Sequence, residues 1–315
     1  MNDLEVPHLI LNSIYPKFLP SWLRAILFNI HMCIKKKKNI FFSLDRITCP
    51  DIYRAGDGVH KVFIKEMRKS LFNPLHIVYL YLEKKCFQKA KHIIANSNLI
   101  KKQIIQTYQI NPEKISVIYN GINTEMQDYN SSYKKLSDEF KINNERIFLY
   151  VGSGFRRKGV KEFLELLSNI NYKYQAFIVG NDKNIGKYMK FSMELGIDRK
   201  VTFTGPREDV NDFYAIADFL ILPTHYEPFS NVILEAMLQK TVVFTTKQNG
   251  ASEILSNDFI MKYPSDRSIL NLIEELIHND KKINNIKLIN SSHAKEFSIE
   301  KNLNQTLQII NEYCN

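Results

Sequence analysis

Residues 225–237 read HYEPFSNVILEAM and hold two glutamates, Glu227 and Glu235, eight positions apart. Pro228 follows the first glutamate, and an apolar run typical of a helix begins after Ser230. Serine is a preferred residue at a helix N-terminus, so we expect Ser230 to cap a helix that starts at the next residue. Because a carboxylate accepts hydrogen bonds from pairs of hydroxyl groups, both glutamates fit a polyhydroxylated ligand.

The start of this expected helix is a candidate anion site. Its donors would be the free backbone N–H groups of Phe229, Ser230, Asn231 and Val232. The alternative interpretation is a surface glutamate followed by an acid that complements the positive end of the helix dipole. The spacing of the glutamates does not choose between them.

A second loop, VGSGFRRKGV at residues 151–160, is rich in glycine and positive charge. It differs from the dinucleotide fingerprint GxGxxG because Arg157 stands where the third glycine would be. Arg157 and Lys158 follow a turn that includes Gly152 and Ser153, and they open a helix. Cations beside the N–H groups of a helix start predict a pyrophosphate site, and the alternative is a solvated basic loop.

The elements around these loops alternate regularly between residues 144 and 292. Short apolar runs separated by amphipathic segments indicate a doubly wound domain with a parallel sheet. The expected strands are RIFLYVG, YQAFIVG, VTFTG, DFLILPT and TVVFTT, with helices near 185–195 and 210–217 among those between them. Ligands bind beyond the carboxyl ends of such strands, where both loops lie.

The first half of the chain repeats this pattern less clearly. Its expected strands are NIFFSLD, HIIANS and ISVIYNG, and its expected helices lie near 61–68, 75–89 and 98–108. The polar stretch 123–145 is interpreted as a hinge. We therefore expect two Rossmann-like domains that face each other across a cleft. The predicted units are residues 1–135, residues 136–295 and a C-terminal helix, 296–315, that returns toward the first domain.

Composition limits the class of protein. The chain has 315 residues, a net charge of +10 and a pI of about 9.2. Such a charge can attract nucleic acid, anionic lipid or a phosphorylated small molecule. The start of the sequence lacks the pattern of a secretory signal, and no apolar run is long enough to span a membrane, so we expect a cytoplasmic protein. Scattered cysteines predict reduced thiols and no zinc site (Cys33, Cys49, Cys86, Cys314).

Four consecutive lysines, Lys35 to Lys38, directly follow the apolar segment 19–34. An apolar helix that ends in a lysine cluster is typical of a helix at an anionic membrane surface. A buried crossover helix that ends in a solvated loop explains the same pattern, and the sequence leaves both interpretations open.

Taken together, these motifs resemble the retaining glycosyltransferases of family 4, which have the GT-B fold. The likeness is greatest to the lipopolysaccharide core glucosyltransferases that add glucose to a heptose. It is carried by VGSGFRRKGV, TGPREDV, ADFLILPTHYEPFSNVILEAM and, in the first half, CPDIYRAGDGVH. The resemblance implies transfer of a hexose from a nucleoside diphosphate sugar, such as UDP-glucose, to a sugar hydroxyl of a lipopolysaccharide or lipooligosaccharide core.

The resemblance also assigns roles on the donor side. It implies that Glu235 binds the ribose and that Glu227 approaches the donor sugar hydroxyls. Arg157 and Lys158 would hold the diphosphate together with the amides of the turn after Pro228. A weaker correspondence gives Arg207 a contact with the base. The chain has no Asp-x-Asp pair, so we expect no metal cofactor.

On the acceptor side, Asp57 and His60 in GDGVH are the candidates, with Asp57 included among the catalytic residues. Their alternative is a capping aspartate and a surface histidine in a glycine turn. The expected acceptor is a glycolipid, which would place the protein on the inner face of the cell membrane.

The sequence departs from this family at its start. MNDLEVPHLIL resembles the third strand region, about fifty residues into a two-domain enzyme of this size. The first strand and its glycine-rich loop are thus expected to be missing, and a truncated, inactive protein that binds nucleotide or membrane is the alternative function.

A nicotinamide oxidoreductase would need glycine at Arg157 and an acid after the second strand, which Asn181 or Asp182 could imitate. Only net charge favours nucleic acid.

Overall fold

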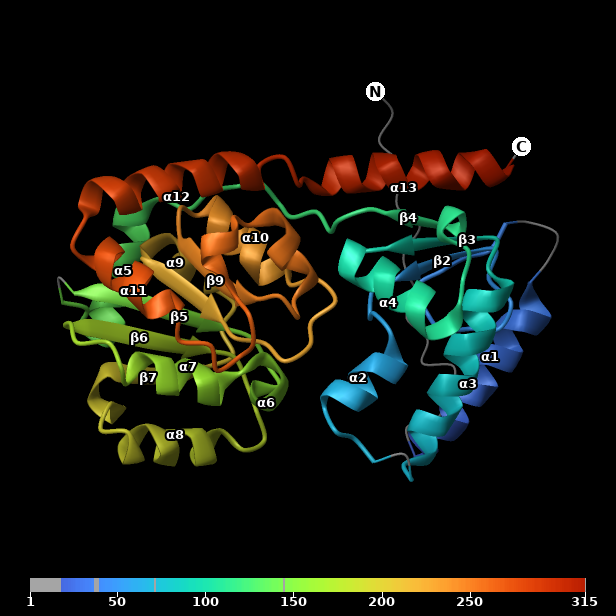
Figure 1. Cartoon of the computed structure of the whole chain (residues 1–315), viewed down its shortest axis with the longest axis horizontal. Helices are drawn as coiled ribbons and strands as arrows, with labels where there is room; N and C mark the ends of the chain where they lie inside the picture. Colours follow the sequence, from blue (N-terminus) through green and yellow to red (C-terminus); the bar gives the residue numbers. More distant parts are fainter. Residues whose placement is uncertain (1–17, 37–39, 71, 144, 315) are drawn as a thin grey trace.

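The computed structural model describes residues 18–36, 40–70, 72–143 and 145–314, and it contains two parallel sheets (Figure 1). The first sheet has the strand order β1-β2-β3-β4, and all of its strand pairs are parallel. Its strands are β1 (Phe42–Ser43), β2 (Ile52–Ala55), β3 (His92–Ala95) and β4 (Ile115–Val117). Its helices are α1 (Ser21–Lys35), α2 (His60–Glu66), α3 (Pro74–Lys89) and α4 (Asn98–Tyr108), and a 3-10 turn, η1 (Pro112–Lys114), precedes β4.

The second sheet has the order β10-β9-β8-β5-β6-β7, again with parallel pairs. Its strands are β5 (Arg146–Val151), β6 (Tyr174–Val179), β7 (Val201–Gly205), β8 (Phe219–Leu222), β9 (Val242–Thr246) and β10 (Ile260–Met261). The elements between them are α6 (Phe155–Lys158), α7 (Val160–Leu167), α8 (Ile185–Glu194), η2 (Asp198–Lys200), α9 (Val210–Ile216), α10 (Asn231–Leu238), η3 (Gly250–Ile254) and η4 (Asn257–Phe259). These two parallel sheets confirm the α/β fold class that the alternating pattern predicted.

The centre of the second sheet forms the largest core. Every residue of β8 and β9 is buried, as expected for strands covered by helices on both faces. Phe148 of β5 stacks on Phe219 of β8 with ring centroids 4.9 Å apart. This rigid core fixes the carboxyl ends of β5 and β8, from which the two loops of interest leave.

The polar stretch expected to be a hinge contains a helix, α5 (Tyr129–Phe140), that packs on α9. Asp128 caps it by accepting a hydrogen bond from the Ser131 N–H at 2.9 Å. Leu136 is fully buried, and Ser132 donates to Asp212 of α9 at 2.6 Å. The helix was missed because a few apolar side chains in a polar segment give weak periodicity, and packing against α9 provides the missing stability.

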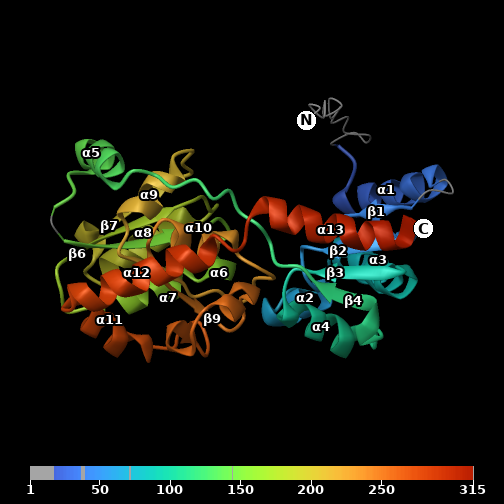
Figure 2. The ribbon, with the colours of Figure 1, turned by 90° about the horizontal axis from the view of Figure 1, so that it is seen from above.

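The last three helices are α11 (Ile269–Ile277), α12 (Asp280–Ala294) and α13 (Ile299–Cys314). Figure 2 shows α12 over the second sheet and α13 over the first. Ile309 of α13 packs with Ile52 and Ile94 of the first sheet, and the Tyr313 hydroxyl lies 3.1 Å from His92 Nδ1. The C-terminal helix therefore returns to the first domain, while the residue boundaries of the domains stay predictions.

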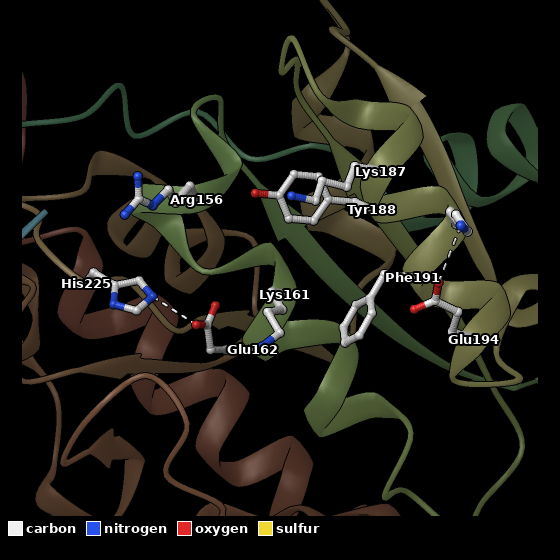
Figure 3. A pocket seen from close by; sticks show the side chains of 9 residues that line it. Arg156, Lys161, Glu162, Lys187, Tyr188, Phe191, Glu194 and His225 are labelled. Atoms are coloured by element: carbon white, nitrogen blue, oxygen red, sulfur yellow. Dashed lines mark hydrogen bonds and ion pairs between the residues drawn. The ribbon is translucent and has the colours of Figure 1, made fainter. Parts of the chain in front are cut away.

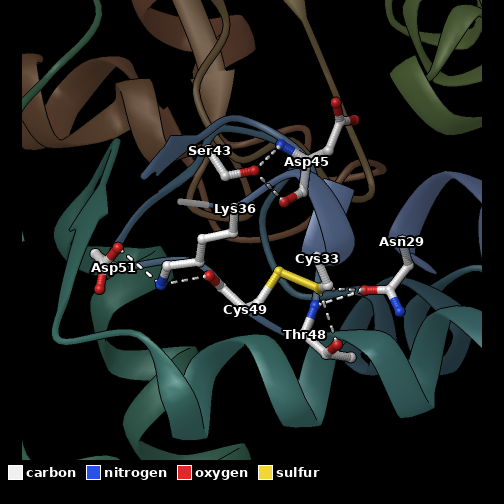
Figure 4. The surroundings of a disulfide bond; sticks show 8 residues. All are labelled: Asn29, Cys33, Lys36, Ser43, Asp45, Thr48, Cys49 and Asp51. Atoms are coloured by element: carbon white, nitrogen blue, oxygen red, sulfur yellow. Dashed lines mark hydrogen bonds and ion pairs between the residues drawn. A yellow bond between two sulfur atoms is a disulfide. The ribbon is translucent and has the colours of Figure 1, made fainter. Parts of the chain in front are cut away.

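One expectation about cysteine is wrong. Cys33 and Cys49 form a disulfide between the end of α1 and the loop before β2, with Cα atoms 5.7 Å apart (Figure 4). The N–H of Thr48 donates to Asn29 Oδ1 at 2.7 Å, which draws this loop onto α1. A separation of sixteen residues is no recognisable motif, so only the packing of α1 shows the pairing. Cys86 and Cys314 are free.

Gly159, between α6 and α7, provides a test of how the fold positions the first loop. Its φ is +81°, and an added Cβ would collide with the carbonyl oxygen of Pro223 after β8. Gly159→Ala should therefore destabilise the protein by about 1–3 kcal/mol from the left-handed backbone alone, with the collision adding to that cost. Urea unfolding measures the difference.

Gly186→Ala is the matched control, since that glycine lies inside α8 and an added Cβ meets no atom within 4 Å. It should be neutral or stabilising by about 0.4–1 kcal/mol. Equal free energies of unfolding for the two variants would show that the Gly159 turn places no constraint on the fold.

Candidate functional site

The loop after β5 forms a short helix, α6, between two glycines in the left-handed conformation, Gly154 and Gly159. The N–H of Phe155, at the start of α6, donates to Asp182 Oδ2 at 2.8 Å. Asp182 thus holds the turn in place, which is a structural use of the acid that the oxidoreductase alternative requires after the second strand. Ser153 Oγ accepts a hydrogen bond from the Asn181 N–H at 3.3 Å, so the strand-end loops of β5 and β6 are joined.

The cations of α6 lie against the first glutamate. Arg157 Nη1 is 2.6 Å from Glu227 Oε2 and donates to the carbonyl of Tyr226 at 3.0 Å. Lys158 Nζ lies 3.5 Å from the same Glu227 oxygen, and both side chains are only 13% exposed. The structure therefore brings together three of the predicted residues, with two positive charges against one negative charge.

The loop that carries Glu227 is held on both sides. Its backbone is bonded within the second domain, since the Glu227 N–H donates to the Gln248 carbonyl at 3.0 Å. The first domain also binds it: Ser97 Oγ donates to the Pro228 carbonyl at 2.9 Å, and the Val59 N–H donates to the Tyr226 hydroxyl at 2.8 Å. Contacts between the domains thus help to position the first glutamate.

The start of α10 differs in part from the prediction. Ser230 stands at the N-cap, but its side chain makes no capping hydrogen bond, and its buried Oγ has no partner among the described residues. The Ser230 N–H is already bonded to Asn249 Oδ1 at 3.2 Å. The N–H groups of Phe229, Asn231 and Val232 donate to no described residue. Three predicted donors and one orphaned hydroxyl are therefore left for an anion.

Glu235 occupies separate surroundings one turn into α10. Its Oε2 accepts a hydrogen bond from the Tyr214 hydroxyl at 2.9 Å. Burial raises the pKa of Glu235, although the Tyr214 hydroxyl and the charge of Lys158 act to lower it. It lines a small cavity of about 120 Å³ with Asn123 and Asn211, whereas Glu227 lines a different one. The two glutamates can therefore contact different parts of one elongated ligand.

The residues predicted on the acceptor side share a cavity with those on the donor side. This cavity of about 310 Å³ lies between the domains and includes Asp57 and His60 opposite Arg157 and Glu227. Its full lining is Arg46, Gly56, Asp57, His60, Phe63, Tyr79, Arg157, Tyr226, Glu227 and Pro228. A cavity lined by carboxylates, cations and aromatic rings has the groups needed to bind a sugar.

Arg46 and Glu83 belong to this site but were not predicted. Arg46 is paired with Asp57 and with Glu83, each at 3.1 Å. The fully buried Glu83 also accepts hydrogen bonds from the His60 N–H and the Tyr108 hydroxyl, both at 2.6 Å. The sequence held one signal for Glu83, since it is an acid on the apolar face of the expected helix 75–89. A carboxylate buried there needs hydrogen-bond or ion-pair partners. Arg46 lies in no motif.

His60 is buried, so the surface interpretation of this residue is wrong. Its Nε2 lies 3.1 Å from His76 Nδ1. Burial, followed by the charges of Arg46 and His76, lowers the pKa of His60 to about 4. The imidazole is therefore neutral at neutral pH, and it can donate or accept a hydrogen bond without adding charge to the cavity.

Arg207 is placed outside this cluster. Its guanidinium is paired with Glu139 at 2.7 Å and with Asp209 at 2.8 Å, and it lies over the rings of Phe140 and Phe213. These contacts fasten α5 to the loop after β7. The predicted contact with a base would require Arg207 to leave both carboxylates.

The described residues contain no group of three or more histidine, cysteine, aspartate or glutamate side chains placed to hold a metal ion. Arg157 and Lys158 supply positive charge beside Glu227.

Two parallel-sheet domains with a site at their facing strand ends define the GT-B class, and comparison with solved structures agrees. The fold matches crystal structures of WaaG, a glycosyltransferase involved in lipopolysaccharide biosynthesis (TM-score 0.77, 20% identity, 91% of this chain and 81% of that one), and of Anabaena HepE in complex with UDP and glucose (TM-score 0.75, 20% identity, 93% and 76%). This likeness confirms the GT-B fold.

The chain belongs to the glycosyl transferases group 1 family, whose model matches residues 132–290. The model of Glycosyltransferase Family 4 matches residues 53–126. The family expected from the two loops is thereby confirmed.

Curated relatives are more distant in sequence. An uncharacterized glycosyltransferase of Methanocaldococcus jannaschii, MJ1607, is 28% identical over 184 residues, which are 55% of this chain and 47% of that protein. The lipopolysaccharide glucosyltransferase WaaG of Escherichia coli is 27% identical over 221 residues, which are 66% of this chain and 58% of that protein. The alignments thus span about half to three fifths of these relatives.

The low pKa of His60 predicts a pH dependence of stability. The unfolded histidine binds a proton with a pKa of about 6.5, whereas the folded one does so only near pH 4. The unfolded state therefore holds more protons between these values, and this contribution to stability is complete above pH 6.5 and is lost as the pH falls toward 4. A His60→Gln variant should lose less stability over that window.

Histidine proton resonances measured by NMR test the same point directly. The resonance that is absent from the His60→Gln spectrum should titrate near pH 4. A midpoint near 6.5 would mean that His60 is solvated and carries its charge freely.

Proposed function

We propose that this protein transfers a hexose from a nucleoside diphosphate sugar, UDP-glucose in the simplest case, to a sugar hydroxyl of a lipopolysaccharide or lipooligosaccharide core or a similar glycan. The observation that carries the proposal is the pairing of Arg157 and Lys158 with Glu227 beside the unbonded N–H groups at the start of α10. Membership of the family and the similarity to the lipopolysaccharide glucosyltransferase WaaG support it.

The proposed chemistry follows from charge. Arg157, Lys158 and the N–H groups of Asn231 and Val232 stabilise the negative charge that develops on the departing diphosphate. Glu227, held by both cations, accepts hydrogen bonds from the donor sugar, and Glu235 does so from the ribose. The acceptor hydroxyl attacks from the face that the diphosphate leaves, so the anomeric configuration is retained, and the leaving phosphate takes the proton. Asp57 and His60 then line the acceptor side.

We propose that no metal ion is needed, since two protein cations already lie beside Glu227, where the diphosphate would bind. A protein that binds the nucleotide without turnover is the second candidate. Incubation with UDP-glucose and an acceptor glycan separates the two candidates. Release of UDP together with a glycosylated product supports transfer, whereas UDP binding without product supports the second candidate.

The first prediction of the proposed function concerns the diphosphate. Replacing both Arg157 and Lys158 with alanine should weaken UDP binding by about 3–6 kcal/mol, because each charge-assisted hydrogen bond contributes about 1.5–3 kcal/mol. Isothermal titration calorimetry measures the affinity for UDP. NAD, the ligand that a nicotinamide oxidoreductase would bind, should not bind measurably. EDTA should leave the affinity for UDP unchanged.

Arg156→Ala is the matched control, because Arg156 lies on the same short helix but lines a different cavity. It should leave UDP binding nearly unchanged. If the folded double variant binds UDP as tightly as the original protein, the phosphate role of Arg157 and Lys158 is excluded.

The second prediction separates the two glutamates. Glu235→Ala should weaken the binding of UDP, since the ribose is present in UDP and in UDP-glucose alike. Glu227→Ala should spare UDP and lower sugar transfer or UDP-glucose hydrolysis, since only UDP-glucose carries the sugar. The comparison needs the UDP dissociation constant and the turnover rate of each variant. Equal losses of UDP affinity would contradict this division.

We further propose that the protein acts in the cytoplasm at the surface of an anionic bilayer, where a glycolipid acceptor would lie. Helix α1 supports this, because none of its residues is buried and Trp22, Ile30 and Ile34 are 36%, 47% and 79% exposed. No helix among the described residues is long and apolar enough to cross a bilayer. Contact with the surface through one amphipathic face fits these facts.

The lysine cluster is only partly available to a membrane. Lys36 is paired with Asp51 at 2.8 Å and donates to the Cys49 carbonyl at 3.0 Å, so it ties the end of α1 to the segment before β2. Lys35 is exposed, while Lys37 and Lys38 lie outside the described residues.

The third prediction uses Trp22, the single tryptophan of the chain, as a reporter. Its fluorescence should shift to shorter wavelength with vesicles that contain phosphatidylglycerol but not with phosphatidylcholine alone. Salt should reverse the shift, because screening acts over about 8 Å at physiological ionic strength. Replacing Lys35, Lys37 and Lys38 with glutamine, with Lys36 kept, should weaken binding without changing the affinity for UDP.

Two lysines on and beside α12, Lys281 and Lys295, provide the charge control, and replacing them with glutamine should leave vesicle binding intact. An unshifted Trp22 spectrum, or equal binding by the triple variant, would mean that α1 does not meet the lipid.

A further inference from the structure

A cavity of about 650 Å³ lies between α7 and α8, outside the cluster around Glu227 (Figure 3). It is lined chiefly by Arg156, Lys161, Glu162, Lys187, Tyr188 and Phe191, with His225 at one end. Its volume is within the range of small-molecule sites in proteins. The proposed function gives it no role.

Most charges in this cavity already have partners. Glu162 lies 2.9 Å from His225 Nε2, and Glu194 is paired with Lys190 at 4.0 Å. Lys161 is paired with Glu165 at 3.2 Å, with its ammonium over the ring of Phe191. The two acidic side chains that line the cavity, Glu162 and Glu194, therefore both have partners.

Arg156 and Lys187 differ, because neither side chain has an acidic partner among the described residues. The Tyr188 hydroxyl likewise makes no hydrogen bond to a described residue, and Figure 3 shows it directed toward Arg156. Two unpaired cations and a hydroxyl on one side of a cavity are the groups that bind a phosphate. The half-buried rings of Tyr188 and Phe191 beside them offer apolar surface for the rest of a ligand.

The cavity also adjoins the donor loops through α6. Arg157, the next residue after Arg156, lies against Glu227, and its carbonyl accepts a hydrogen bond from the His225 N–H at 2.9 Å. The consecutive arginines of α6 therefore line two different cavities. The sequence alone assigned this basic loop to a single anion site.

We propose that the cavity between α7 and α8 is a second anion site, which binds a phosphorylated sugar with its phosphate between Arg156, Lys187 and the Tyr188 hydroxyl. The sugar ring packs on Tyr188 and Phe191. The ligand is either a free sugar phosphate or a phosphorylated unit of the acceptor glycan. Only the second source rests on the proposed function.

The test is calorimetric titration of glucose 6-phosphate into the Arg157→Gln, Lys158→Gln variant, whose first anion site is neutralised. This variant should still bind one equivalent of glucose 6-phosphate, and neutral glucose should not compete. Adding Arg156→Gln and Lys187→Gln should weaken that binding at least tenfold. Adding Lys281→Gln and Lys295→Gln instead, which removes the same charge elsewhere, should leave it unchanged.

Three results would overturn the proposal: no saturable binding, loss of binding on neutralising Arg157 and Lys158 alone, or equal weakening by the control pair. Failure of the proposed function is visible separately, as absence of UDP binding by the original protein.

Incubation with UDP-glucose and glucose 6-phosphate then distinguishes the two sources of the ligand. A glycosylated sugar phosphate identifies an acceptor, and glucose 6-phosphate recovered unchanged identifies a free ligand.

Discussion

The ion pair between Arg157 and Glu227 is the contact on which the site depends. It joins the loops after β5 and β8, and the core packing of these neighbouring strands sets the distance between the basic helix and the start of α10. With Lys158 also at Glu227, the unliganded cluster holds one more positive than negative charge. A bound diphosphate would neutralise this excess positive charge. The unliganded cluster is therefore already arranged to bind an anion.

The second requirement is that both domains shape the same cavity. The loop that carries Glu227 receives hydrogen bonds from Ser97 and Val59 of the first domain. Arg46, held by the buried Glu83, aligns Asp57 at the opposite wall. A change in the angle between the domains would therefore disturb these hydrogen bonds and move the predicted acceptor groups relative to Glu227. Glu235, bonded to Tyr214 within the second domain, would stay in place.

Sequence patterns predicted the parts of this molecule that are local. The buried strands of the second sheet, α4 and the glycine turn before Arg157 follow from apolar runs and turn residues. What the sequence could not provide depends on contacts between distant residues. Packing on α9 stabilises α5, the fold of α1 brings Cys33 to Cys49, and Asn249 takes the amide that Ser230 was expected to offer. Arg207 followed the motif but met two carboxylates that no motif indicates.

The most direct measurement is a crystal structure of the protein with UDP-glucose. The diphosphate should lie between Arg157, Lys158 and the N–H groups of Asn231 and Val232, with its oxygens about 2.7–3.2 Å from these donors. The glucose hydroxyls should contact Glu227, and the ribose should contact Glu235. A nucleotide bound elsewhere, with the Arg157–Glu227 pair untouched and the start of α10 empty, would contradict the account.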